Sequence, residues 1–153
     1  MITYFDTSSL IKLVVDETGS DRASAIWETA DNVAAVRLVI VEGRAALAAA
    51  TRAGRLTSEQ YDEARQEFSR FADGLAIVEV TETLVAAAAD LAEEEGLRGY
   101  DAVHLAGALA LEADVMCSAD DDLCAAAERS GLHVANPNVP VDEPEHADEP
   151  DDS

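Results

Sequence analysis

Four acidic residues of this sequence occupy positions where a carboxylate could do chemistry. Two of them each follow a short β-prone run, and the other two lie in apolar segments with helical spacing. These residues are Asp6, Asp120, Glu42 and Asp101. If all four met at one edge of a sheet, they would form a hard oxygen site suited to Mg²⁺ or Mn²⁺. A site of that kind activates water and stabilises charge on a phosphoryl group during in-line displacement.

Each of these acids also has a structural interpretation. Asp6, Asp101 and Asp120 each come before a predicted helix, where Asp commonly caps the first turn. Glu42 has only apolar neighbours one turn away on its helix, so burial would be costly unless a cation or a hydrogen-bond donor met it. Its structural alternative is an ion pair with an arginine such as Arg98. The residues alone leave both interpretations open.

The elements that must position these acids alternate along the chain. Strands are predicted over 2–5, 33–36, 75–80, 115–118 and 132–135. A first helix is predicted soon after Asp6, because residues 10, 11, 13 and 14 are apolar at helical spacing. Further helices are predicted over 21–29, 38–53, 58–73, 82–95, 101–112 and 120–129. We expect Ser20, Thr57 and Thr81 to cap helices, with Gln60 completing a capping box. Strands that alternate with helices predict a mostly parallel sheet with helices on both faces.

One domain and a tail account for the whole length. Residues 1–136 carry the alternating pattern and are predicted to form a single α/β domain. Residues 137–153 are rich in Pro, Asp and Glu, and we expect this acidic tail to be disordered.

The charge of the chain is strongly negative. It has 32 acidic residues against 10 basic ones, a formal net charge of −22, and Lys12 is its only lysine. Without the segment from Asp142 to Ser153 the charge is still −15, so the folded body itself is acidic. Repulsion of this size burdens a compact domain in dilute buffer and is screened at molar salt. We therefore expect a salt-rich cytoplasm, as in halophilic archaea; an acidic mesophilic protein is the alternative.

Composition also indicates the cellular compartment of the protein and the redox state of its cysteines. No apolar run is long enough to span a bilayer, and no basic segment precedes an apolar one at the N-terminus, so we expect a cytoplasmic protein. Cys117 and Cys124 are too few for a disulfide framework and lack zinc spacing. We expect both to be buried, reduced thiols.

Four segments of the chain resemble the sequence motifs of one protein family and occur in the same order. They are Phe5-Asp6-Thr7-Ser8-Ser9-Leu10, the isolated helix acid Glu42, Leu97-Arg98-Gly99-Tyr100-Asp101-Ala102-Val103-His104-Leu105-Ala106, and Cys117-Ser118-Ala119-Asp120. Over about residues 2–136 the sequence resembles PIN-domain proteins, and most closely the VapC-type toxins of toxin–antitoxin pairs. The resemblance implies a three-layer α/β/α PIN-like fold and a Mg²⁺- or Mn²⁺-dependent endoribonuclease.

The same resemblance assigns roles to individual residues. Asp6, Glu42, Asp101 and Asp120 match the four acidic positions, which are both catalytic and metal-binding. Small polar residues, Ser8 and Ser118, match positions that support Asp6 and Asp120, and Asp122 is a candidate accessory acid. The resemblance also implies an RNA substrate, a homodimer, and a cognate protein antitoxin whose C-terminal segment covers the site.

Three further residues are candidates for contact with substrate. Arg98 could bind the RNA backbone or pair with a carboxylate. Lys12 could lie near the phosphate path, although simple solvent exposure is the easier interpretation. His104 could touch substrate, but its apolar helix favours a hydrogen-bonded packing role. The aromatic residues Trp27, Tyr61, Phe68 and Phe71 are predicted to form core or dimer contacts.

Other classes of protein fit less well. A PIN-like module that binds a partner or RNA without cleaving it is the main alternative, although no acidic position is lost. A phosphorylated receiver domain needs paired acids after its first strand and a late lysine, and a phosphatase with an Asp nucleophile needs an acid at position 8, where Ser8 stands. An acidic body is expected to repel RNA, and the sequence has no basic patch with interleaved aromatic residues, so we expect RNA to be held mainly through a bridging metal ion and local hydrogen bonds.

The charge yields a first test. Because salt screens repulsion among surface acids, we expect the melting temperature to rise steadily with KCl concentration up to the molar range. Thermal melting across a KCl series measures this. A protein that is most stable at low salt would contradict the inferred salt-rich origin.

Overall fold

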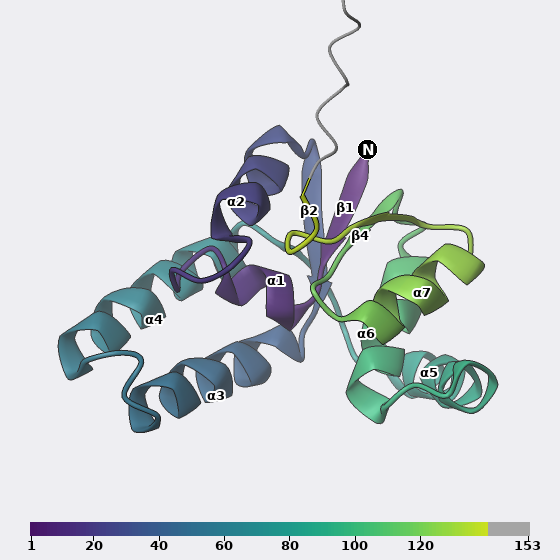
Figure 1. The fold of residues 1–153 in the computed structure, drawn as a ribbon. Coiled ribbons are helices and arrows are strands. Elements are labelled where there is room, and N and C mark those ends of the chain that lie inside the picture. Colours follow the sequence, from purple (N-terminus) through teal and green to yellow (C-terminus); the bar gives the residue numbers. More distant parts are fainter. Residues whose placement is uncertain (141–153) are drawn as a thin grey trace, which may run out of the picture.

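A five-stranded parallel sheet runs through the middle of residues 1–140, the part of the chain that this computed structural model describes (Figure 1). Its strand order is β3-β2-β1-β4-β5, and all four neighbouring pairs are parallel. The strands are β1 (Ile2–Phe5), β2 (Asn32–Val36), β3 (Ala76–Val78), β4 (Val115–Cys117) and β5 (His133–Ala135). The predicted parallel sheet is confirmed, with each strand within a few residues of its expected position.

Helices cover both faces of this sheet. One face carries α1 (Thr7–Ile11), α2 (Ser20–Thr29), α3 (Val39–Arg52) and α4 (Ser58–Asp73), and the other carries α5 (Glu82–Glu95), α6 (Gly99–Ala110) and α7 (Asp121–Arg129) (Figure 1). The three layers are those of an α/β/α fold. None of the helices within residues 1–140 is long and apolar enough to cross a membrane.

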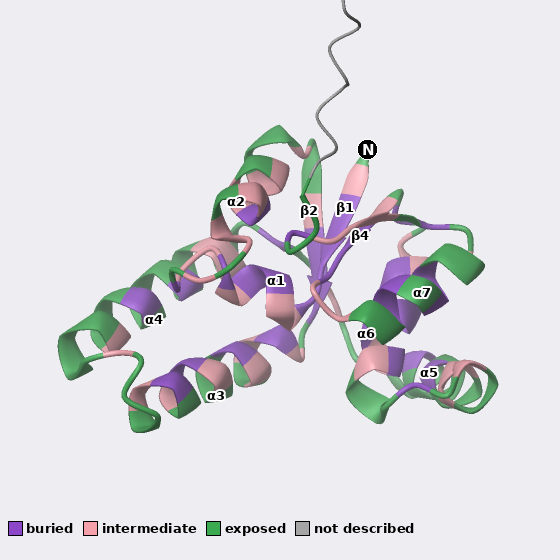
Figure 2. Ribbon diagram, in the orientation of Figure 1, coloured by how far each residue is buried: buried purple, intermediate pink, exposed green. Residues whose placement is uncertain are grey.

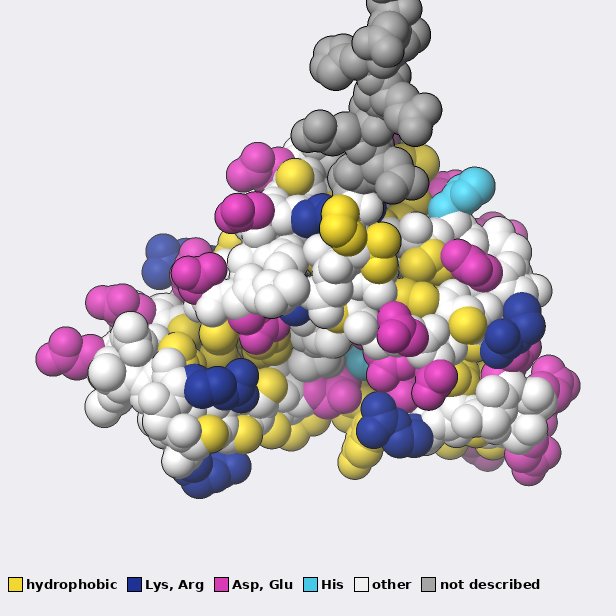
Figure 3. Space-filling view, in the orientation of Figure 1, with side chains coloured by type: hydrophobic (Ala, Val, Ile, Leu, Met, Phe, Trp, Pro, Cys, Tyr) yellow, Lys and Arg dark blue, Asp and Glu magenta, His cyan; other side chains and the backbone are white. Residues whose placement is uncertain are grey.

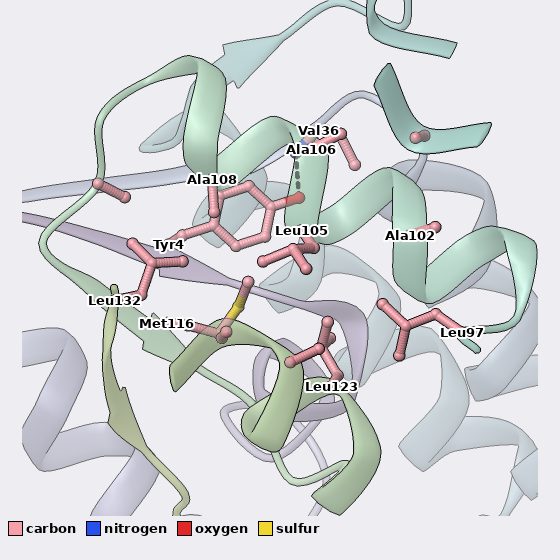
Figure 4. Packing of buried hydrophobic residues seen from close by; sticks show 14 of the residues in the cluster. Tyr4, Val36, Leu97, Ala102, Leu105, Ala106, Ala108, Met116, Leu123 and Leu132 are labelled. Atoms are coloured by element: carbon pink, nitrogen blue, oxygen red, sulfur yellow. Dashed lines mark hydrogen bonds between the residues drawn. The ribbon is translucent and has the colours of Figure 1, made fainter. Parts of the chain in front are cut away.

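Side-chain alternation along the strands builds two separate cores. Tyr4 and Phe5 are both fully buried, yet they belong to different clusters, because successive residues of a strand point to opposite faces. Figure 2 shows the buried residues concentrated where the helices meet the sheet. Tyr4, Met116 and Leu105 pack together under α5, α6 and α7 (Figure 4). Phe5 and Phe68 lie in the cluster under α1 to α4, and Trp27 contacts Phe5 edge-on.

The predicted caps hold with one exception. The Thr57 hydroxyl accepts from the Gln60 N–H, and the Gln60 side chain accepts from the Thr57 N–H, so the capping box is present. Thr81 caps α5 through the N–H of Leu84. Ser20 does not cap α2: it is the first residue of the helix, and its hydroxyl donates to the carbonyl of Val15.

The start of α6 also differs from the prediction. This helix begins at Gly99, two residues before the expected start at Asp101, and Arg98 stands at its N-cap position. Asp101 is therefore the third helical residue and not a cap. The loop predicted over 96–100 is shorter, because Gly99 and Tyr100 already have helical geometry.

The strand order creates a topological switch point beside the central strand. From β1 the chain moves outward through β2 and β3, and then returns to the other side of β1 for β4 and β5. The order therefore reverses between β1 and β4, where the connections leave the strand ends in opposite directions. In open α/β sheets, ligands bind at the carboxyl edge of such a switch point.

The beginning of the predicted tail is ordered. Pro137 is buried, the Asn138 N–H donates to the Asn136 side chain, and residues 137–140 line a pocket with the loop that precedes α2. The folded body therefore continues to residue 140. The rest of the predicted acidic tail, 141–153, lies outside the described residues.

Gly107 lets α6 approach the sheet, which gives a stability test. A Cβ at this position would lie 2.4 Å from Cγ1 of Val36 and 3.3 Å from the Tyr4 ring. We expect Gly107→Ala to destabilise the fold by about 1–3 kcal/mol, because overpacking outweighs the helix-forming advantage of alanine. Urea unfolding measures this. Gly99→Ala, in the same helix with nothing within 4 Å of its Cβ position, is the control and should be close to neutral. Equal stabilities for the two variants would contradict the argument.

Candidate active site

Asp6 lies at the carboxyl end of β1 with its charge buried and heavily hydrogen-bonded. Only 4% of the residue is exposed. Its Oδ1 accepts from the Ser8 hydroxyl at 2.7 Å and from the Ser9 N–H at 3.0 Å. It also shares the single hydrogen of the Ser9 hydroxyl, 2.8 Å away, with the Cys117 carbonyl at 2.6 Å. Its Oδ2 accepts from the Ser118 hydroxyl at 2.6 Å. Four donors around one carboxylate compensate the cost of burying it.

Two serine hydroxyls join the ends of β1 and β4. Ser118 donates to Asp6 and accepts from the N–H of Asp120 at 3.0 Å. Ser8 donates to Asp6 and accepts from the N–H of Ala119 at 3.0 Å. Each hydroxyl thus links the turn after one strand to the turn after its neighbour, as the predicted supporting roles require.

The capping interpretation holds for two of the acids. Asp6 Oδ1 caps α1 through the Ser9 N–H, and Asp120 Oδ1 caps α7 through the N–H of Leu123 at 2.9 Å. Capping in each case uses Oδ1 and leaves Oδ2 directed to other groups. An Asp can therefore cap its helix and still offer an oxygen to a site.

Asp101 and Asp120 share one guanidinium. Arg98 donates from Nε to Oδ2 of Asp101 at 3.3 Å and from Nη2 to Oδ2 of Asp120 at 3.4 Å. Burial raises the pKa of Asp101 above its usual value, and the neighbouring Asp120 and Asp6 carboxylates raise it further, against the effect of Arg98. The shared arginine shows that Asp101 and Asp120, distant in sequence, lie close together in space.

Glu42 is held by two hydrogen-bond donors. Its Oε1 accepts from the Thr7 hydroxyl at 2.8 Å and lies 2.8 Å from Nε2 of His104. Burial acts to raise the pKa of Glu42, but the hydrogen bonds from His104 and Thr7 hold it below its usual value. The alternative ion pair with Arg98 does not form, because Arg98 pairs with Asp101 and Asp120.

The three candidates for substrate contact differ in their surroundings. Arg98 has 81% of its side chain exposed although it pairs with two acids. His104 is 2% exposed, which agrees with the hydrogen-bonded packing role. Lys12 was expected to be exposed, and this was wrong: it is 6% exposed, and its Nζ donates to the Thr18 carbonyl at 2.6 Å and to Glu17. Asp122, the candidate accessory acid, is exposed in the first turn of α7.

Sequence reasoning missed three contributors to the site. Thr7 and Ser9 hold Glu42 and Asp6, and the run of hydroxyl residues after Asp6 was a usable signal for both. Tyr4 supports His104 from inside β1, 2.8 Å from Nδ1. A tyrosine in a buried strand has no sequence signature that separates this role from ordinary packing.

The carboxylate oxygens of the four acids suit a hard divalent cation in their type and number. The four acids supply only carboxylate oxygens, and Oε2 of Glu42 and Oδ1 of Asp101 have no hydrogen-bond partner among residues 1–140. Within that range no three His, Cys, Asp or Glu side chains converge tightly enough to hold a metal as they stand. The guanidinium of Arg98 lies between two of the acids, where it balances charge that a metal ion would otherwise balance.

An apolar groove opens beside these acids. Its volume is about 720 Å³, and its lining combines Glu42, Arg98 and Asp101 with apolar side chains of α3, α5 and α6 such as Leu38, Val85 and Val103. Tyr100 and Val85 on its lining are 65% and 49% exposed. In Figure 3, acidic side chains gather with a basic one over the region between α1 and α6. The cluster is thus open to a large partner on this side.

Thiol chemistry has no part in the site. Both cysteines are free and buried, as expected. Burial raises the pKa of Cys117 to about 12 and that of Cys124 to about 11, so both remain protonated thiols near neutral pH.

The protein thus has a parallel α/β sheet with four acids near its switch point, and comparison gives the family. Residues 3–129 match the model of the PIN domain, so the chain belongs to the PIN-domain family. Ribonuclease VapC45 of Mycobacterium tuberculosis is 44% identical over 110 residues, which cover 72% of this chain and 76% of that protein.

Solved structures agree on the fold. PAE2754 from Pyrobaculum aerophilum superposes with a TM-score of 0.68 at 21% identity, over 88% of this chain and 83% of that one. A toxin–antitoxin complex from Klebsiella pneumoniae gives a TM-score of 0.63 at 17% identity, over 88% and 97%. At these identities the two structures show a common fold alone.

Asp101 and Glu42 have pKa values shifted in opposite directions, which gives a matched test of stability against pH. The raised pKa of Asp101 means that its ionised form disfavours folding, a penalty absent below the ordinary value of 3.8 and complete above the folded value. The lowered pKa of Glu42 means that its ionised form favours folding, a contribution lost as the pH falls through the folded value from the ordinary 4.5.

We therefore expect opposite effects from the two neutral variants. Without divalent ions near neutral pH, Asp101→Asn should raise the free energy of unfolding and Glu42→Gln should lower it, and both differences should shrink as the pH falls toward the carboxyl range. Urea unfolding at several pH values measures this. Changes of the same sign in the two variants would contradict the assignment.

Proposed function

We propose that this protein is a Mg²⁺- or Mn²⁺-dependent endoribonuclease that hydrolyses RNA phosphodiester bonds as the toxin of a toxin–antitoxin pair. The observation that carries the proposal is the linkage of the four acids at one sheet edge: Ser118 joins Asp6 to Asp120, Arg98 joins Asp120 to Asp101, and Thr7 joins Glu42 to the same turn. The 44% identity to a VapC ribonuclease supports the same activity.

The roles follow from this arrangement. Asp6, Glu42, Asp101 and Asp120 would hold the cation through carboxylate oxygens. The bound cation would supply an activated water and stabilise charge on the phosphoryl group. Ser8 and Ser118 fix Asp6, so that its carboxylate does not have to reorganise. Arg98, exposed beside two acids, could exchange a carboxylate for an RNA phosphate once a cation takes over their charge.

The partners and setting complete the proposal. The groove beside Glu42 and Asp101 suits an antitoxin segment with apolar side chains and one cation, since both kinds of surface meet there. A solved relative of this fold is a toxin–antitoxin complex. We further propose a homodimer in the cytoplasm, and the acid excess supports a salt-rich cytoplasm as its setting.

One observation favours a second candidate, a PIN-fold module that binds a partner without cleaving RNA. No three potential metal-ligating side chains in residues 1–140 converge closely enough to hold an ion as they stand. Such a module would keep the groove and the fold but would not need a divalent cation. The following experiment separates the two candidates.

The test is cleavage of RNA by antitoxin-free protein at molar KCl, with Mg²⁺ or Mn²⁺ against EDTA. We expect cation-dependent cutting that falls by at least about 100-fold in Asp6→Asn and Asp101→Asn, because each loses a charged oxygen that the reaction needs. Asp62→Asn, which neutralises an exposed acid of α4 outside the site, is the matched control. Full activity in Asp101→Asn would refute the site, and folded wild type inactive with both cations would favour the binding module.

A further inference from the structure

A chain of hydrogen bonds runs from the sheet to Glu42 through the interior of the molecule. The Val36 N–H donates to the Tyr4 hydroxyl at 3.1 Å, and that hydroxyl lies 2.8 Å from Nδ1 of His104. Nε2 of His104 lies 2.8 Å from Oε1 of Glu42. The chain therefore connects β2, β1, α6 and α3, and every member before Glu42 is buried.

The direction of each hydrogen bond follows from counting hydrogens. The Tyr4 hydroxyl is fully buried, accepts from Val36 and carries one hydrogen of its own. If Nδ1 of His104 also donated to it, that hydrogen would have no partner among residues 1–140, at an appreciable cost. Tyr4 therefore donates to Nδ1. The ring then carries a hydrogen on Nε2 and donates it to Glu42.

This arrangement fixes the carboxylate of Glu42. Oε1 receives the His104 N–H from one side and the Thr7 hydroxyl from the other, both at 2.8 Å. Oε2 is left without a hydrogen-bond partner in the described part of the chain. A flexible glutamate side chain is thus held in one orientation with one oxygen committed and one oxygen available.

Packing alone does not account for these residues. An apolar side chain at position 104 would fill the space beneath α6, where the His104 ring already makes an edge-on contact with Tyr4. It could not donate to Glu42 or accept from Tyr4. Two polar groups placed in sequence inside an apolar core indicate that the orientation of Glu42 is what the chain secures.

We propose that His104 is a positioning residue, locked by Tyr4 in the tautomer that donates from Nε2, and that it orients Glu42 for binding a divalent cation. This inference rests on the proposed function, because it gives the orientation of Glu42 a purpose. His104 touches neither substrate nor cation and acts only through the carboxylate.

The first test reads the tautomer directly. ¹⁵N NMR of the metal-free protein should show His104 with a protonated Nε2 and an unprotonated Nδ1 near neutral pH. The exposed His133, which has no buried hydrogen-bond partner among residues 1–140 to select a tautomer, provides the internal comparison. In Tyr4→Phe the preference at His104 should disappear. A protonated Nδ1 in the wild type would overturn the proposal.

The second test uses two variants of similar polarity. His104→Gln places an amide N–H₂ near the position of Nε2, where it can still donate to Glu42. His104→Asn reaches only the position of Nδ1 and loses that donor. We expect His104→Asn to weaken Mn²⁺ binding in calorimetry by about 10- to 100-fold, as for other residues that orient a metal ligand, and His104→Gln to stay close to wild type.

Unfolding measured on both variants separates positioning from packing. A purely structural role predicts equal losses of Mn²⁺ affinity in the two, in proportion to lost stability, and that result would overturn the proposal. Failure of the proposed function has a different signature. If the wild type binds Mn²⁺ but cuts no RNA, the nuclease proposal fails while the Gln–Asn difference still decides the role of His104. If the wild type binds no Mn²⁺, both fail.

Discussion

Repulsion among negative charges at one edge of a sheet is the constraint on which the rest of this structure depends. Asp6, Glu42, Asp101 and Asp120 come together in a protein that already carries a net charge of −22. The fold does not place a single counter-charge at the centre of the cluster. The compensation is divided among several groups. Serine hydroxyls meet Asp6, and Thr7 and His104 donate to Glu42. Asp101 and Asp120 share Arg98, and Asp120 also lies at the N-terminus of α7.

The groups that stabilise these carboxylates differ in how easily they can move away from them. The serine, threonine and histidine donors are built into buried or half-buried turns and helices, so they hold their carboxylates permanently. Arg98 is mostly exposed and reaches its acids through longer contacts of 3.3 and 3.4 Å. The same cluster therefore has a rigid half around Asp6 and Glu42 and an exchangeable half around Asp101 and Asp120. An exchangeable counter-charge is what a site needs if a cation is to enter it.

The sequence allowed much of this to be predicted, for physical reasons. Asp6 and Asp120 follow short strands, and the alternation of strands and helices required a parallel sheet whose carboxyl edge would collect both. Glu42 stood out because an acid on an apolar helix face needs a donor. The identity of that donor was not predictable: Tyr4, His104 and Thr7 meet it only through the packing of α6 against the sheet, which depends on Gly107.

The errors are equally specific. Asp101 was expected at the start of its helix, but Gly99 and Tyr100 extend the helix by two residues. The local sequence does not distinguish the two possible starting points. Lys12 was expected in solvent because lysine is rarely buried, yet the loop before α2 wraps its ammonium with a carbonyl and a carboxylate. Such a loop conformation depends on contacts, including those of residues 137–140, that no single segment encodes.

The burial of Lys12 determines how this protein will respond to reagents. It is the only lysine of the chain, and its amine is enclosed by the loop before α2, so reagents that acylate or cross-link lysine side chains will find no lysine on the folded surface. Both thiols are buried as well, so maleimides will react slowly. Carboxyl-directed reagents will instead label the protein heavily. Immobilisation, fluorescent tagging and cross-linking to partners should therefore be planned through carboxylates, through the exposed α-amino group of Met1 or through an introduced cysteine.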